Sequence, residues 1–288
     1  MPRDPFEHPV RVASTDGVAV ASYDLGGEGP DVLCAHATGF CAGVWGPMAA
    51  GLDGHVQAMD LRGHGRTALP PGVGMAWSGT AEDVLAVVDG RGLRRPVGLG
   101  HSMGGASLLL AEAARPGTFA GLWLFEPIVF PPSFREGPGG PNPLVEGARR
   151  RRPTFPSAEA AVAHYASKPP LDQLRPDALA AYVRHGFEAL PDGSVTLRCR
   201  PEVEAATFEM GPQHDGWDLL ERIGCPVTVV RGHPDAAPPA ALAPAIVERL
   251  PHGRLEEHPE LGHFGPLEDP DAMAASANSV IRAVTGAA

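Results

Sequence analysis

The segment that most constrains the fold of this chain is Gly100-His101-Ser102-Met103-Gly104-Gly105. A short apolar run, Pro96–Leu99, precedes it, and Ala106–Ala114, with the composition of a helix, follows it. Strand, sharp turn and helix in this order fit the G-x-S-x-G pattern, in which glycines permit a strained turn and the serine hydroxyl is presented at the end of the strand. Ser102 is therefore a candidate nucleophile. The alternative is a glycine-rich turn whose serine only caps the helix.

Short apolar strands alternate with helical segments along most of the chain, which predicts a mostly parallel sheet covered by helices on both faces. The predicted strands are Val10–Ser14, Val18–Leu25, Asp31–His36, Val56–Asp60, Pro96–Leu99, Gly121–Phe125, Pro226–Val230 and Arg254–His258. The predicted helices of this part are Thr80–Asp89, the run after Ser102, and Asp269–Val284. Thr15-Asp16-Gly17 predicts a hairpin turn between the first two strands.

The alternation stops between residues 131 and 215. This segment opens with the Gly- and Pro-rich run Gly137–Pro141 and continues with helical runs at Ala158–Ser167 and Asp177–Leu190. A structureless loop of this length is implausible. We therefore expect an α/β core at residues 1–130 and 216–288, and an inserted helical cap at 131–215 that roofs Ser102 and buries an apolar part of the substrate. Its candidate lining aromatics are Phe155, Tyr165, Tyr182, Phe187 and Phe208.

A serine nucleophile needs a neighbouring base and a group that orients the base. After a nucleophile at the top of a sheet, the acid and then the histidine are expected along the chain. Asp235 follows the strand Pro226–Val230, and His263 follows the last strand. Glu126, at the end of the strand Gly121–Phe125, is the alternative acid or a substrate contact.

The other histidines are weaker candidates for the base. His258 falls inside a predicted strand, His233 in the acid loop, and His101 beside the serine. We expect His36 and His64 to join loops through hydrogen bonds. The oxyanion needs two preorganised N–H donors, and Met103 and Thr38 are the candidates.

These motifs together resemble the α/β-hydrolase superfamily. The matching pieces are His36-Ala37-Thr38-Gly39-Phe40, Asp60-Leu61-Arg62-Gly63-His64-Gly65, the segment around Ser102, Gly232-x-x-Asp235 and Gly262-His263-Phe264. The resemblance implies an eight-stranded sheet, a Ser-Asp-His triad and no cofactor. Ala37 departs from the glycine usual after that histidine, so the oxyanion loop is open to reshaping. Ser102 stands where relatives similar to epoxide hydrolases and haloalkane dehalogenases carry aspartate, which disfavours those activities.

Composition limits the partners. The net charge of −11 argues against nucleic acid. Four cysteines without CxxC spacing predict neither a metal site nor a disulfide framework. Without an apolar secretory signal or a membrane-spanning run, we expect a cytoplasmic protein with a small-molecule substrate and no membrane partner. A homodimer stays open. The run Arg149–Arg152 is expected on a solvated face, with an anion site as the alternative.

Three functions follow from these residues. The first is a serine hydrolase that cleaves an ester, thioester or lactone through an acyl-enzyme. The second is a C–C bond hydrolase, or another biosynthetic enzyme such as a cyclase or lyase, on the same triad. The third is a non-catalytic protein that binds a ligand under the cap.

Overall fold

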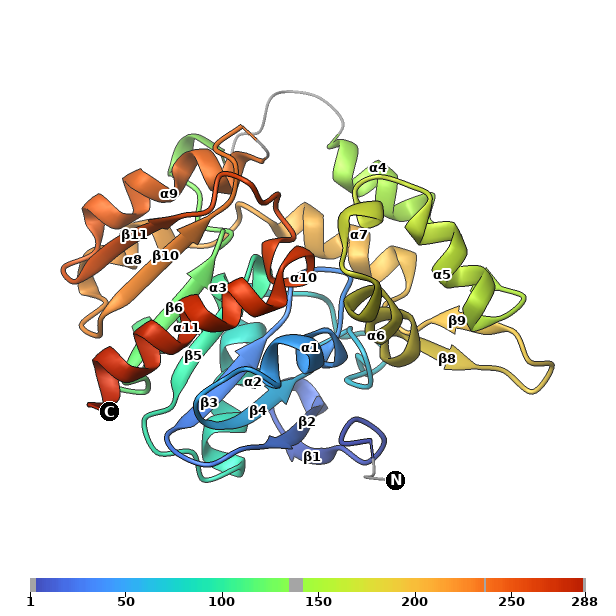
Figure 1. The fold of residues 1–288 in the computed structure, drawn as a ribbon, viewed down its shortest axis with the longest axis horizontal. Coiled ribbons are helices and arrows are strands. Elements are labelled where there is room, and N and C mark those ends of the chain that lie inside the picture. The colour runs from blue at the N-terminus through green and yellow to red at the C-terminus, as the bar shows by residue number, and fades with distance from the viewer. Residues whose placement is uncertain (1–3, 135–141, 236, 287–288) are drawn as a thin grey trace.

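The computed structural model describes residues 4–134, 142–235 and 237–286, so the predicted opening of the insertion at Gly137–Pro141 lies outside the described residues. Its centre is an eight-stranded sheet in the order β1-β2-β4-β3-β5-β6-β10-β11 (Figure 1). The strands are β1 Val10–Ala13, β2 Ala19–Gly26, β3 Asp31–Ala35, β4 His55–Met59, β5 Val97–His101, β6 Gly121–Phe125, β10 Val227–Arg231 and β11 Gly253–Glu257. The predicted mostly parallel sheet is confirmed.

The direction of each strand follows from its connection. A tight turn, η1 (Thr15–Gly17), joins β1 to β2, and both residues Asp16 and Gly17 have positive φ there. The β1–β2 and β2–β4 pairs are antiparallel, whereas the remaining pairs of this sheet are parallel. Every residue of β5 and β6 is buried, as expected for central strands covered on both faces. The carboxyl ends of the parallel strands therefore meet at one edge.

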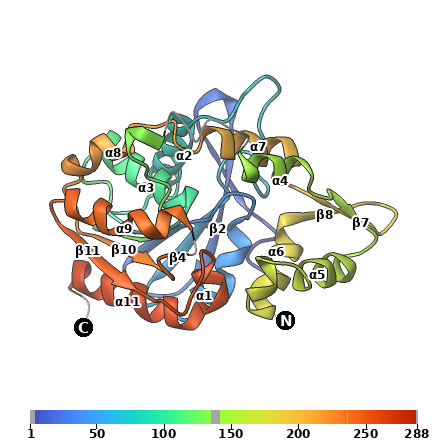
Figure 2. The ribbon, with the colours of Figure 1, turned by 90° about the horizontal axis from the view of Figure 1, so that it is seen from above.

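Two layers of helices cover the sheet (Figure 2). On one face lie α1 (Gly46–Ala49) and α11 (Pro270–Thr285), and on the other lie α2 (Trp77–Gly90), α3 (Met103–Ala114) and α9 (Pro238–Arg249). The core is accordingly divided into two apolar clusters, one on each face. The short elements of the core are η2 Ala42–Trp45, α8 Gly216–Leu219, η5 Leu220–Arg222 and α10 Gly265–Glu268.

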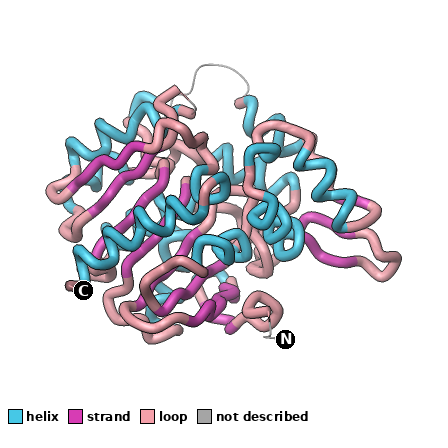
Figure 3. Tube along the Cα trace, viewed as in Figure 1, coloured by secondary structure: helices cyan, strands magenta, loops and turns pink. Residues whose placement is uncertain are grey.

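The segment 131–215, hereafter the inserted segment, combines helices with a small antiparallel sheet (Figure 3). Its elements are η3 Pro132–Phe134, α4 Pro143–Arg149, β7 Thr154–Phe155, α5 Ala158–Ala166, η4 Leu171–Gln173, α6 Pro176–Gly186, β8 Phe187–Ala189, β9 Val195–Leu197 and α7 Pro201–Met210. The predicted helix Asp177–Leu190 is wrong after Gly186. There the chain enters β8, because Phe187–Ala189 pairs with β9 across the turn at Gly193.

The inserted segment packs against the loop after β3 and against α10, at the carboxyl edge of the main sheet. The ring of Tyr182 lies 4.9 Å from that of Phe40, which follows β3. The backbone N–H of Arg175 donates to the carbonyl of Leu267 at 2.9 Å. These contacts bring the inserted segment to the edge at which β5 ends in His101. Among the described residues, no helix is both long enough and apolar enough to span a bilayer.

Candidate active site

Ser102 occupies a strained turn between β5 and α3. Its φ of 55° is unusual for a residue other than glycine. Its N–H donates to the carbonyl of Phe125 at 2.9 Å, which ties the turn to the next strand. Two glycines make the turn sterically possible: a Cβ at Gly100 would lie 2.6 Å from the Cα of Gly105, and one at Gly104 would lie 2.1 Å from the carbonyl oxygen of Ala35. The predicted strand, turn and helix are confirmed.

His263 lies between the serine and a carboxylate. The Ser102 hydroxyl donates to Nε2 of His263 at 3.2 Å, and Nδ1–H of His263 donates to Oε2 of Glu126 at 2.5 Å. Ser102 is 5% exposed, the Glu126 side chain is fully buried and the His263 side chain is 23% exposed. The three groups form a continuous chain of hydrogen bonds that can carry a proton from the hydroxyl to the imidazole and stabilise the resulting cation.

Glu126 is held as firmly as the serine. It follows β6 with a φ of 44°, and its N–H donates to the carbonyl of Val230 at 2.9 Å. Its second carboxylate oxygen, Oε1, accepts from the backbone N–H of Gly232 at 2.9 Å. Both oxygens of this buried carboxylate therefore accept hydrogen bonds, which offset the free-energy cost of burying its charge.

The expectation that Asp235 contacts His263 is wrong, because Glu126 occupies that position. Asp235 lies in an exposed turn, and its N–H donates to Nδ1 of His233 at 3.2 Å. In this loop it is Gly232, three residues before Asp235, that contacts the site. A Cβ at Gly232 would lie 2.4 Å from the carbonyl oxygen of Leu261, so only glycine fits there. Gly232 gives its N–H to Glu126, and the following residues turn away to the surface.

Two further side chains fix the backbone around His263. Nε2 of His101 donates to the carbonyl of His263 at 2.8 Å. The Glu268 carboxylate accepts from the N–H groups of Gly262 at 2.7 Å and Phe264 at 3.2 Å. Burial lowers the pKa of His101 well below its usual range, and the neighbouring His263 adds to this effect. From the sequence, His101 is considered only as a candidate base, and Glu268 is not singled out. The contact of His101 joins residues 162 positions apart and leaves no local pattern.

His258 and His36 have hydrogen-bond partners other than Ser102. His258 lies between the carboxylates of Glu256, at 2.9 Å, and Glu260, at 3.3 Å. His36 joins two loops as expected: its Nε2 accepts from the N–H of Leu61 at 3.1 Å, and its Nδ1–H donates to the carbonyl of Ala37 at 2.8 Å. The described part of the chain contains no cluster of three His, Cys, Asp or Glu side chains that could hold a metal.

The segments that carry the two candidate oxyanion donors lie against each other. Gly104, which follows Met103, approaches the end of β3, and a Cβ there would also lie 2.8 Å from the carbonyl oxygen of His36. Thr38 lies in a turn in which Phe40 N–H donates to Ala37 at 3.2 Å. Ala37 does not have a positive φ, so its side chain causes no backbone strain in this loop. The positive φ of the loop, 81°, is at Gly39 instead.

The aromatic side chains of the inserted segment pack mainly against one another. Phe155, Tyr165 and Phe187 form a buried cluster with mutual ring distances of 5.7 to 6.2 Å. Tyr182 belongs to the same cluster and also reaches Phe40. Phe208 is partly buried against a separate small cluster. Of these five aromatic side chains, all within the described residues, Tyr182 alone makes a ring contact with the loop after β3.

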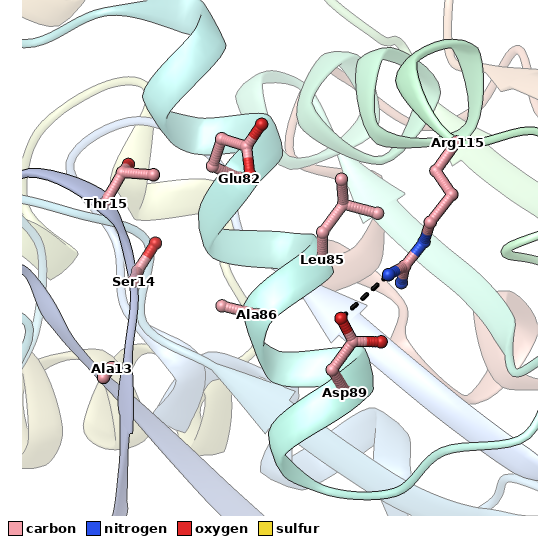
Figure 4. A pocket seen from close by; sticks show the side chains of 8 residues that line it. All are labelled: Ala13, Ser14, Thr15, Glu82, Leu85, Ala86, Asp89 and Arg115. Atoms are coloured by element: carbon pink, nitrogen blue, oxygen red, sulfur yellow. Dashed lines mark hydrogen bonds and ion pairs between the residues drawn. The ribbon is translucent and has the colours of Figure 1, made fainter.

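Figure 4 shows a shallow hollow of about 330 Å³ that is lined by none of the three residues of the candidate site. Its lining includes Ser14, Glu82, Asp89 and Arg115, and Arg115 donates to Asp89 at 2.8 Å. Ser102 precedes the first residue of α3, whereas Arg115 follows its last. A helix of this length separates its ends by about 18 Å. The hollow is therefore at the opposite edge of the sheet.

Comparison with known sequences gives a family match over most of the chain. The sequence model of the alpha/beta hydrolase family matches residues 32–276. Protein phosphatase methylesterase 1 of Mus musculus is 39% identical over 99 residues, which are 32% of this chain but only 26% of that protein's length. A non-heme chloroperoxidase of Streptomyces lividans is 29% identical over 273 residues, covering 87% of this chain and 95% of that protein.

Comparison with solved structures agrees on the fold. The structure of E-2-(acetamidomethylene)succinate hydrolase superposes with a TM-score of 0.77, covering 95% of this chain and 99% of that one. The sequence identity is 19%, so this likeness concerns the fold alone.

Proposed function

The chain belongs to the alpha/beta hydrolase family, and on that premise we propose that it is a serine hydrolase that cleaves an ester, thioester or lactone of a small to medium organic substrate. The observation that carries the proposal is the chain of hydrogen bonds from the Ser102 hydroxyl through His263 to the Glu126 carboxylate. The methylesterase relative supports a carboxylic ester as the bond cleaved.

In this mechanism, the Ser102 oxygen attacks the substrate carbonyl while Nε2 of His263 takes the hydroxyl proton. Glu126 keeps the proton of Nδ1 in place and stabilises the imidazolium that forms. The N–H groups of Met103 and Thr38 stabilise the oxyanion. His263 then protonates the leaving group, an acyl-enzyme remains on Ser102, and water activated by His263 releases the acid.

The inserted segment is proposed to act as the cap over this site. Its contact at Phe40 lies on the loop of the predicted oxyanion donor, and its contact at Leu267 lies on α10, close to His263 in sequence. The low exposure of Ser102 supports an enclosed reaction site. Enclosure excludes bulk water and strengthens the electrostatic contacts to the transition state.

A fluorophosphonate probe tests the nucleophile directly. We expect the folded protein to be labelled at Ser102, whereas Ser102→Ala should remain folded, lose labelling and lose turnover of p-nitrophenyl esters by several orders of magnitude. Ser107→Ala is the matched control, because Ser107 lies one turn further along α3 and donates to Met103. Absence of labelling in folded protein would favour the ligand-binding alternative. Turnover of vinylogous diketones but not of esters would favour C–C bond cleavage.

A further inference from the structure

The four consecutive arginines of the inserted segment have different environments. The Arg149 side chain is 52% exposed and pairs with Glu209, whereas that of Arg151 is only 18% exposed. Nη1 of Arg151 donates to Oε2 of Glu204 at 2.5 Å, and Nη2 donates to the hydroxyls of Tyr165 at 3.0 Å and Tyr182 at 2.5 Å. Arg151 thus joins three helices, α5, α6 and α7, from inside the segment.

This ion pair lies against the loop that carries the candidate oxyanion donor. A Cβ at Gly39 would lie 2.6 Å from Oε1 of Glu204 and 3.3 Å from Nη1 of Arg151. Gly39 directly follows Thr38. Glycine at this position, with its φ of 81°, therefore leaves room for the carboxylate and the guanidinium within one residue of the proposed oxyanion site.

His64 adds a third polar group nearby. Its Nδ1–H donates to the carbonyl of Arg62 at 3.0 Å, which leaves Nε2 as an acceptor. This Nε2 is buried and has no hydrogen-bond partner among the described residues. Its loop touches the inserted segment, since a Cβ at Gly63 would lie 2.5 Å from the Val203 side chain. Burial, with contributions from His36 and Arg151, lowers the pKa of His64 to about 3, so Nε2 stays unprotonated.

These three residues offer both donors and acceptors to a ligand. Among the described residues, Nε–H of Arg151 and one hydrogen of Nη1 have no hydrogen-bond acceptor, and Oε1 of Glu204 has no hydrogen-bond donor. The charges of Arg151 and Glu204 cancel. A neutral group that both accepts and donates fits this set, because it can take a hydrogen bond from the guanidinium and give one to Glu204 or His64.

We propose that Arg151, Glu204 and His64 form a subsite for a hydroxyl or carboxamide group on the acyl part of the substrate, close to the carbonyl that Ser102 attacks. This inference rests on the proposed function and names the substrate class of the same site. An alkyl chain there would leave buried polar atoms without partners. A carboxylate would meet the like charge of Glu204.

Matched activated esters test the subsite. The set is p-nitrophenyl butyrate, p-nitrophenyl 2- and 3-hydroxybutyrate, and mono-p-nitrophenyl succinate. We expect kcat/KM for at least one hydroxybutyrate to exceed that for butyrate by about tenfold or more, which corresponds to one well-placed hydrogen bond. Equal or faster turnover of butyrate would overturn the subsite while leaving the hydrolase proposal intact. Failure of every ester together with failure of fluorophosphonate labelling would instead overturn the hydrolase proposal. Preference for the succinate would replace the neutral subsite by an anion site.

Variants of the Arg151–Glu204 ion pair test whether this pair causes the preference for hydroxybutyrate over butyrate. The double variant Arg151→Met with Glu204→Leu removes both charges together, so neither is left unpaired, and should bring the ratio of hydroxybutyrate to butyrate kcat/KM to about one. The control variant, Arg149→Gln with Glu209→Gln, removes the exposed pair that joins α4 to α7 and should keep the native ratio. A native ratio in the first variant would overturn the proposal.

Glu204→Gln provides a second test that does not depend on the double variant folding. It keeps the shape of the side chain but leaves the Arg151 charge uncompensated. The preference should therefore shift toward the succinate ester by about tenfold relative to butyrate. An unchanged succinate-to-butyrate ratio would contradict the position of Glu204 beside the acyl group.

Discussion

Ser102 and Glu126 both have a positive φ, and holding a residue other than glycine in such a sparsely populated backbone conformation costs roughly 1 kcal/mol or more. Each is fixed by a backbone hydrogen bond to a neighbouring strand: Ser102 N–H to Phe125, and Glu126 N–H to Val230. In these conformations the hydroxyl and the carboxylate both lie within hydrogen-bond distance of His263. Two residues with unusual backbone conformation therefore supply two of the three groups of the candidate site.

Replacing each acidic candidate separately by its amide is the sharpest test, at the residue scale, of which carboxylate orients His263. Glu126→Gln should lower kcat by roughly 10³- to 10⁴-fold, because an amide N–H facing Nδ1 would favour the wrong imidazole tautomer. Asp235→Asn, in the exposed turn, should retain near-native kcat. Steady-state kinetics on one activated ester, with circular dichroism to verify folding, measures both. A larger loss in Asp235→Asn would mean that the Glu126–His263 contact does not orient the base.

The local sequence around these residues explains what could be predicted. Ser102 and His263 come with glycines that mark tight turns, and both lie where expected. The acid has no such marker. Gly232 predicted a functional loop at the end of β10. In the structure the backbone N–H of Gly232 donates to Glu126, a contact between residues 106 positions apart. Only the three-dimensional arrangement decides between two carboxylates at the ends of adjacent strands.

At the scale of elements, the approach of α3 to β3 depends on Gly104. Gly104→Ala would place a methyl group 2.1 Å from the Ala35 carbonyl oxygen, so we expect a loss of at least about 2 kcal/mol in the free energy of unfolding. Gly147→Ala is the matched change in α4, where a Cβ meets nothing within 4 Å. It should raise the free energy of unfolding by about 0.5–1 kcal/mol. Chemical denaturation measures both, and a stable Gly104→Ala protein would contradict the close approach.

The elements themselves were predictable to different degrees. The buried strands of the main sheet follow from short apolar runs bounded by turns, and their bounds agree within about two residues. The elements of the inserted segment were harder to predict from the sequence. Its helices α5 and α6 follow from their composition, but β8 is set by pairing with β9, so Phe187–Ala189 read as a continuation of the helix.

For the molecule as a whole, buried neutral histidines predict loss of stability in acid. Burial lowers the pKa of His36 to about 4 and that of His64 to about 3, and it lowers that of His101 well below its usual range. In the unfolded chain each titrates near 6.5. As pH falls below about 6.5, the unfolded state binds protons at these histidines and the folded state does not, so the free energy of unfolding decreases. The decrease due to His36 continues to about pH 4 and that due to His64 to about pH 3.

The expected slope approaches about 1.4 kcal/mol per pH unit for each of these histidines. His55 acts in the opposite sense, because its hydrogen bond with Asp31 and the nearby Asp24 raise its pKa, but this side chain is partly exposed. Urea denaturation at pH 7, 6, 5.5 and 5 measures the net slope. The exposed variant His233→Asn should leave it unchanged. A flat profile between pH 7 and 5 would contradict buried neutral histidines.

The position of the acid on β6 affects the order in which the site can assemble. Ser102 and Glu126 belong to one strand–helix–strand unit, β5-α3-β6, whereas His263 lies 137 residues beyond Glu126. During synthesis, the candidate nucleophile and the candidate acid can be placed long before the candidate base emerges from the ribosome. Recovery of activity during refolding would then report the docking of the C-terminal segment, which carries His263, onto a sheet in which the two other proposed catalytic groups are already in place.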